Sequence, residues 1–215
     1  MKNRFDLIIF DWDGTLIDSI DWITHCLQTA GARCGCAVPE RQAAKDVIGL
    51  SIDKAMRALF PEADETIRAQ LVSHYSQEYF SKQISGDDLF AGVYDMLVQL
   101  KALGYQLAVA TGKTRAGLDE ALTGTGTAEL FCATRCADET ASKPDPRMLN
   151  EIMRHANVAK ERTLMVGDSI HDLQMALNAQ IASIGVSCGA HSEAFLQHYQ
   201  PLYCLREPTQ LLELI

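Results

Sequence analysis

What the chain lacks narrows its class before any motif is considered. No apolar run approaches the ~18 residues that a membrane-spanning helix needs, so no membrane span is expected. Acidic residues outnumber basic ones, 28 Asp and Glu against 19 Lys and Arg, and the net charge of -9 argues against a general nucleic-acid binder. The first residues lack the apolar core of an export signal. We therefore expect a cytoplasmic protein that partners neither membranes nor nucleic acids.

The cysteines also lack an ordered pattern. There are seven, an odd number at irregular spacing, and no Cys-x-x-Cys pair supports a metal site around Cys26, Cys34 and Cys36. Reduced thiols, most of them packed as small hydrophobic side chains, account for them. The acidic balance does not exclude an anionic substrate, because a bound metal can make a local site positive.

Four short apolar runs rich in β-branched residues alternate with stretches of helical spacing. The runs are residues 7–10, 106–110, 163–166 and 181–186. In the stretches between them apolar residues recur every three or four positions, as in residues 93–103, which Gly104 follows as a C-terminal signal. Continuous apolar strands that alternate with amphipathic helices predict an α/β fold, with a parallel sheet covered on both faces.

Residues 18–86 do not follow this alternation. They show helical patterns at 22–32, 39–47, 52–60 and 64–82, with no convincing buried strand. We expect a helical cap over 18–86, inserted above the ligand-binding edge of a core made of residues 1–17 and 87–215. Near the C-terminus we expect an edge strand at 203–205 and a closing helix over 208–215, with Pro208 in its first turn.

Polar clusters follow three of the predicted strands. Asp11 and Asp13 follow the first, Thr111-Gly-Lys the second and Gly-Asp168 the third. Ligands of parallel sheets bind at the carboxyl ends of the strands, so these clusters should meet. Asp11 is then a candidate nucleophile and Asp13 a candidate general acid and base. With Asp168 they form a nest of carboxylates for which Mg²⁺ is the expected ion.

A phosphoryl group in such a site needs donors for its charge. Thr111 offers a hydroxyl, Gly112 a backbone N–H and Lys143, in Ser-Lys-Pro-Asp-Pro, a positive charge. Asp172 stands four residues after Asp168 and shares its face if a helix begins near Ser169, so it can orient Lys143 or a metal-bound water.

Each cluster alone has an ordinary explanation. Asp-x-Asp-Gly is a frequent turn, Thr-Gly-Lys can be a strand-to-helix turn, and Gly-Asp-Ser can cap a helix. A calcium loop starting at Asp11 fails, because Leu16 stands where that loop needs glycine and Trp22 where it needs glutamate. The joint occurrence of the clusters, in order and after strands, is much harder to obtain by accident.

Together the clusters resemble the four motifs of the haloacid dehalogenase superfamily, and residues 18–86 resemble the α-helical cap of its phosphoglycolate-phosphatase-like and β-phosphoglucomutase-like branch. The resemblance implies a Rossmann-like core, Mg²⁺ and an aspartyl-phosphate intermediate. It further implies roles for individual residues, with Asp11 as nucleophile, Asp13 as acid and base, Thr111 and Lys143 as phosphate binders, Asp11, Asp168 and the Asp13 carbonyl as metal ligands, and Asp172 as the supporting acid.

Two details of the resemblance bear on function, and the first is that an acid at the position of Asp13 is typical of phosphatases and mutases. True dehalogenases lack an acid at the position of Asp13, so dehalogenation is not expected. Gly112 replaces the asparagine common in relatives, which keeps a backbone contact to phosphate and loses a side-chain one. In the cap, Gly49 resembles the glycine that reaches over the active site, although a helix C-cap explains it equally well. Lys54 and Arg57 either meet the substrate or form a solvated helix face.

We therefore expect a Mg²⁺-dependent phosphatase acting on a small phosphorylated metabolite, as a monomer or homodimer. Two alternatives stay open, a phosphomutase of the same family and a non-catalytic phosphate-sensing module.

Overall fold

The computed structural model describes residues 4–215, and six parallel strands in this range form one sheet of order β3-β2-β1-β4-β5-β6. The strands are β1 Leu7–Phe10, β2 Gln106–Thr111, β3 Ala133–Cys136, β4 Thr163–Gly167, β5 Ala182–Val186 and β6 Tyr203–Leu205. The helices are α1 Ile20–Arg33, α2 Arg41–Asp46, α3 Ile52–Leu59, α4 Glu65–Tyr79, α5 Val93–Ala102, α6 Arg115–Thr125, α7 Arg147–Ala156, α8 Ile170–Ala179 and α9 Glu193–Gln197. Short 3₁₀ helices are η1 Gly86–Asp88, η2 Ala128–Leu130, η3 Lys160–Arg162 and η4 Pro208–Glu213.

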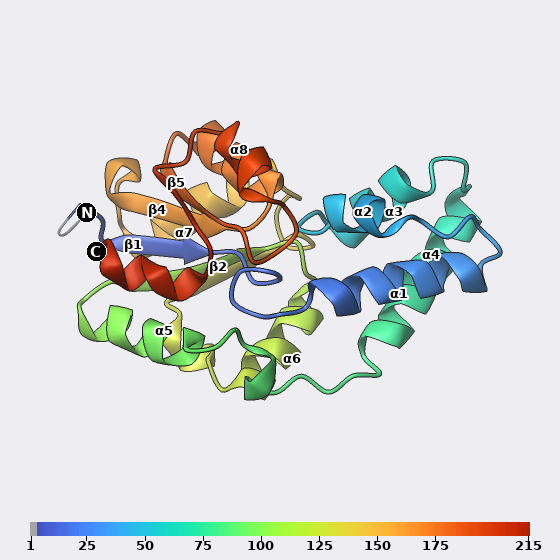
Figure 1. Ribbon diagram of the computed structural model, residues 1–215, viewed down its shortest axis with the longest axis horizontal. Helices are drawn as coiled ribbons and strands as arrows, with labels where there is room; N and C mark the ends of the chain where they lie inside the picture. Colours follow the sequence, from blue (N-terminus) through green and yellow to red (C-terminus); the bar gives the residue numbers. More distant parts are fainter. Residues whose placement is uncertain (1–3) are drawn as a thin grey trace.

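The sheet is buried on both faces, as the apolar runs predict. Alternate residues of β1 point to opposite sides, so Ile8 and Phe10 pack with α5 and α6, whereas Leu7 and Ile9 pack with α7 and α8. Figure 1 shows α5 and α6 on one side of the sheet and α7 and α8 on the other. The predicted α/β class is confirmed.

The central strand β1 pairs with β2 on one side and β4 on the other, with Phe10 level with both Val109 and Val166. Strands β2 and β3 are added on one side of β1, and β4 to β6 on the other. The strand order therefore reverses between β1 and β4, and the carboxyl ends of these two strands border this topological switch point. The acids that follow these two strands are brought to the same edge by this register.

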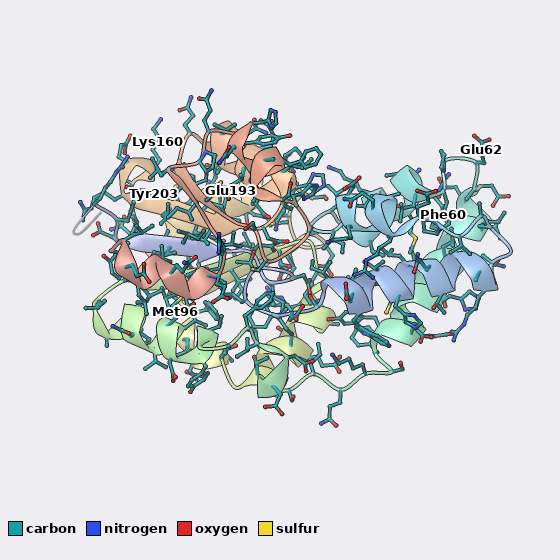
Figure 2. The ribbon with its side chains drawn as sticks, viewed as in Figure 1. Phe60, Glu62, Met96, Lys160, Glu193 and Tyr203 are labelled. Carbon is teal, nitrogen blue, oxygen red and sulfur yellow. The ribbon has the colours of Figure 1, made fainter. Side chains whose placement is uncertain are left out.

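Helices α1 to α4 lie beyond the edge of the sheet at which β1 ends, so the carboxyl end of β1 is directed toward them (Figure 1). They match the four helical patterns read in residues 18–86, and no described residue there belongs to a named strand. Phe60 and Glu62 lie at the end of this helical unit that is farthest from the sheet (Figure 2). Its loop 47–51 lies next to the sheet edge, because a Cβ at Gly112, just after β2, would be 2.5 Å from the Gly49 carbonyl oxygen. The division of the chain at residues 17/18 and 86/87 stays a prediction.

One detail of the predicted strands needs correction, because the edge strand β3 was not predicted. The closing helix expected over 208–215 is present as the 3₁₀ helix η4, Pro208–Glu213, and Pro208 begins it. Its few residues make the tighter turns typical of short helical pieces. Among residues 4–215, no helix combines the length and the apolar character required to cross a bilayer.

Candidate active site

The site begins where β1 ends. The Asp11 N–H donates to the Val166 carbonyl at 2.9 Å, which holds Asp11 level with the end of β4. Gly14 then takes a positive φ of 75°, a conformation that glycine adopts at little cost. The chain turns there, and the side chains of Asp11 and Asp13 face the same cavity of about 80 Å³ between the sheet edge and the helical unit.

Asp11 belongs to a buried cluster of charges. The Lys143 ammonium is fully buried and lies 2.7 Å from Asp11 Oδ1 and 2.6 Å from Asp172 Oδ1. Oxygens of Asp11, Asp168 and Asp172 all lie within 4.8 Å of one another. Three buried carboxylates and a single lysine leave an excess of negative charge at the inner end of the cavity.

Asp168 is held from several sides. Its Oδ1 accepts from the Thr15 hydroxyl at 2.8 Å, and its Oδ2 accepts from the Ala190 N–H at 2.7 Å. The backbone at Gly189 passes so close that a Cβ there would lie 2.0 Å from Asp168 Oδ2. This carboxylate therefore has a fixed position, and a larger residue at 189 would displace it.

The crowding of acids changes their proton affinity. Burial, followed by repulsion from Asp172, raises the pKa of Asp168 to about 7. Burial and the same repulsion raise the pKa of Asp11 well above its usual value, although Lys143 opposes them. Burial lowers the pKa of Lys143, but Asp11 and Asp172 outweigh it and the net pKa rises, so this lysine stays charged. The cluster thus favours bound cations, either protons or a metal.

Asp13 has different partners from Asp11, although only one residue separates them. The Ser19 hydroxyl donates to its Oδ1 at 2.7 Å, and Lys113 Nζ lies 3.0 Å from both of its oxygens. Ser19 is the N-cap residue of α1, yet its side chain makes no capping bond there. Lys113 also donates to the Tyr79 hydroxyl at 2.6 Å. Asp13 is thus fixed at the cavity wall by a serine and a lysine.

The loop after β2 meets the helical unit closely. A Cβ at Gly112 would lie 2.5 Å from the carbonyl oxygens of both Gly49 and Leu50. Gly49 itself has a φ of 96°, and a Cβ there would meet the Ser169 hydroxyl at 3.0 Å. The absence of a side chain at position 112 therefore makes room for loop 47–51 to lie against the sheet edge.

The structure separates the predicted site residues into two sets. Asp11, Asp13, Gly49, Thr111 and Gly112 line the cavity. Lys143, Asp168 and Asp172 lie buried beside Asp11, with Asp172 on the first turn of α8 as the spacing predicted.

The two basic residues of α3 that were considered as substrate contacts, Lys54 and Arg57, do not line the cavity. Lys54 Nζ donates to the carbonyls of Ser142 and Lys143, and the half-exposed Arg57 pairs with Asp53 and Glu65.

Sequence reasoning missed the partners of Asp13 and the aromatic wall of the cavity. Tyr75 and Tyr79 stand one helical turn apart on α4, and their rings stack with centroids 5.9 Å apart. The spacing of two tyrosines by four residues near a helix end was the signal available for this wall. Nothing in the sequence pointed to Ser19 as a partner of an acid six residues earlier.

Comparison with known proteins agrees with this geometry. The family model for haloacid dehalogenase-like hydrolases matches residues 8–186, which is most of the chain and includes all four motifs. The chain belongs to the haloacid dehalogenase-like hydrolases.

Curated relatives in this family carry phosphatase names. The chain is 35% identical over 201 residues to "Probable phosphatase IndB" of Dickeya dadantii, covering 91% of this chain and 86% of that protein. It is 29% identical over 219 residues to a phosphoglycolate phosphatase of Colwellia psychrerythraea, covering 96% and 95% of the two chains. A pyrophosphatase PpaX of Halalkalibacterium halodurans is 28% identical over 220 residues and covers 99% and 97%.

Two solved structures have the same fold as this chain. A hydrolase from Pseudomonas syringae superposes with a TM-score of 0.87 at 20% identity, over 97% of this chain and 96% of that one. The β-phosphoglucomutase of Clostridium difficile superposes with a TM-score of 0.84 at 16% identity, over 96% and 93%.

Proposed function

We propose that this protein is a Mg²⁺-dependent phosphatase that hydrolyses a small phosphomonoester through an aspartyl-phosphate on Asp11. The observation that carries the proposal is the pair of acids at the end of β1, which line one cavity but have unlike partners. One acid faces a buried charge cluster and the other a serine and a lysine, which suits one for nucleophilic attack and the other for proton transfer. The phosphatase names of its relatives agree with this assignment.

The donor set fits Mg²⁺. All candidate ligands are hard oxygens, and Asp11 Oδ2 accepts no hydrogen bond from residues 4–215, so it is free to bind a cation. Asp172 is less suited, because its Oδ1 lies 2.6 Å from the Lys143 ammonium, which repels a second cation. The partners of Asp168 are neutral, the Thr15 hydroxyl and the Ala190 N–H. We assign Asp11, Asp168 and the Asp13 carbonyl as the ligands. When bound, the ion supplies charge that screens the repulsion between carboxylate and phosphate.

The chain's own residues then carry two displacements. Asp11 attacks phosphorus, the bond from phosphorus to the alcohol oxygen breaks, and Asp13 gives its proton to the leaving oxygen. Asp13 next takes a proton from a water molecule, and the hydroxide oxygen attacks phosphorus. The bond between phosphorus and the Asp11 carboxylate then breaks, which releases phosphate and restores Asp11. Thr111 and Gly112, beside both acids on the cavity wall, and the charge of Lys143 are the candidates to hold the phosphoryl oxygens.

The test is phosphate release from acetyl phosphate and benzyl phosphate, measured with Mg²⁺ and with a chelator. Asp11→Asn should lower kcat/KM by about 10³-fold or more, because the nucleophile is lost while the shape is kept. Asp21→Asn, an exposed acid on α1 paired with Arg41, is the control and should retain full activity. Full turnover by Asp11→Asn would overturn the mechanism. Isomer formation without phosphate release, on hexose phosphates, would instead indicate a mutase.

A further inference from the structure

The cavity above Asp11 and Asp13 has mainly apolar walls. Its side chains come from α1 with Ile23 and Leu27, from α3 with Ile52 and Ala55, and from α4 with Tyr75 and Tyr79. The phosphoryl group of a substrate must lie at Asp11, so its leaving group must occupy the space that these side chains enclose. The walls therefore contact the part of the substrate that distinguishes one phosphomonoester from another.

Of the described residues that line this cavity, Lys113 is the one cation, and it is already engaged. Its ammonium lies 3.0 Å from both oxygens of Asp13 and 2.6 Å from the Tyr79 hydroxyl. Its side chain is 7% exposed, and the ammonium also sits 4.4 Å from the centre of the Tyr79 ring. A second anion on the substrate would have to compete with Asp13 for this charge.

The aromatic residues give the cavity a flat surface. The Tyr75 and Tyr79 rings stack at an interplanar angle of 20°, and one end of this pair reaches Lys113 next to Asp13. A planar apolar group that leaves phosphorus at Asp11 would meet this surface. Aromatic groups gain both from burial and from ring contacts of this kind.

We propose, as a deepening of the proposed function on which it rests, that the substrate is a phosphomonoester whose leaving alcohol is apolar or aromatic and carries no second anionic group. This cavity does not suit the substrates that appear in the names of two relatives. Phosphoglycolate and pyrophosphate each bear a second anionic group close to the scissile bond. In this chain that anion would be buried against isoleucine, leucine and tyrosine with no cation of its own, which is strongly unfavourable.

The first test compares two alcohols of similar leaving ability that differ by one charge. With Mg²⁺ and the full-length protein, kcat/KM for benzyl phosphate should exceed that for 4-carboxybenzyl phosphate by about tenfold or more, because a buried unpaired carboxylate loses its hydration. The kcat/KM for benzyl phosphate should likewise exceed the values for phosphoglycolate, pyrophosphate and glucose 6-phosphate. Equal rates, or a preference for any of these polar substrates, would overturn the inference.

Acetyl phosphate separates this failure from a failure of the proposed function, because its small leaving group scarcely reaches the apolar walls. Hydrolysis of acetyl phosphate without a preference for benzyl phosphate would refute the apolar leaving group alone. No Mg²⁺-dependent release from any substrate would refute the phosphatase itself, and this inference with it.

The second test adds a cation to the cavity. Ile52 is the first residue of α3, lines the cavity and is partly exposed, so a longer polar side chain fits there. In Ile52→Lys the ratio of kcat/KM for 4-carboxybenzyl phosphate to that for benzyl phosphate should rise by about tenfold, as expected for one new charge pair. Ile52→Met, of similar length and no charge, should leave the ratio unchanged. A ratio that does not move in Ile52→Lys, or moves equally in both variants, would show that this wall does not contact the leaving group.

Discussion

Replacing Lys143 by methionine tests whether one lysine holds the acid cluster together. Its ammonium is 2.7 Å from Asp11 and 2.6 Å from Asp172, and all three side chains are buried. At an effective dielectric constant near 20, each contact contributes a gross attraction of about 6 kcal/mol. Much of this is offset by the cost of taking the ammonium out of water. Methionine keeps most of the stem and removes the charge, so the acids lose their counter-ion without a large cavity.

We expect Lys143→Met to lower the free energy of unfolding by about 3–5 kcal/mol near pH 8, the cost of leaving a buried charge unpaired. For a chain of this size about 2–4 °C of Tm corresponds to each kcal/mol, so the Tm should fall by about 6–20 °C. Lys160→Met, at an exposed lysine that donates to Gln180, is the matched control and should change Tm by at most about 2 °C.

The loss should depend on pH in one direction. The pKa values of Asp11 and Asp168 are already raised in the folded protein, and removing the lysine raises them further. A carboxyl with a raised folded pKa contributes its stability below its unfolded pKa, near 4, and loses it as the pH rises through the folded pKa. Thermal melts with a chelator at about pH 5 and pH 8 should therefore show a larger deficit at pH 8. Equal deficits at both pH values would mean that packing, and not charge, is what Lys143 provides.

Two further predictions concern the metal and the contact between Gly112 and loop 47–51. Protons compete with Mg²⁺ at Asp168, whose pKa is about 7, so the gain in Tm on adding Mg²⁺ should be larger at about pH 8 than at about pH 6. A rise in Tm on adding Mg²⁺ that does not depend on pH would contradict the assignment of Asp168 as a metal ligand. Gly112→Ala should lower kcat/KM by about tenfold or more, because its Cβ forces loop 47–51 away from the sheet edge, whereas Gly86→Ala, with open space around it, should not. Steady-state kinetics of both variants decide the point.

The central strands of the fold were predictable, because each is a short and continuous run of apolar residues. Strands 7–10 and 163–166 are short continuous apolar runs, and the acids just after them had to meet once the sheet was parallel. The edge strand β3 escaped notice, because only its first and last residues are buried and Thr134 and Arg135 interrupt any apolar run. An edge strand needs fewer apolar residues than a central one, and so it leaves a weaker signal.

The partners of the site residues were harder to predict than the residues themselves. That Lys143 would lie between Asp11 and Asp172 depends on how three strand ends are arranged in space, which no local pattern records. The contact between Lys113 and Asp13 joins residues 100 positions apart. Sequence placed each near the sheet edge and allowed a contact between Asp172 and Lys143, but it left a metal-bound water as the alternative partner and gave no partner for Asp13.

The contact between Lys113 and Asp13 also links the chemistry of this site to the choice of substrate. Asp11 and Asp13 are the same side chain, and their neighbours make them different, because Asp11 faces the buried acids and Lys143 while Asp13 faces Ser19 and Lys113. The lysine that fixes the proposed proton donor is the same lysine that a second substrate anion would need. A substrate that drew Lys113 away would gain an ion pair and release Asp13 from its position at the leaving oxygen. An apolar leaving group makes no such demand on Lys113, so the orientation of Asp13 and the proposed exclusion of anionic leaving groups depend on the same side chain.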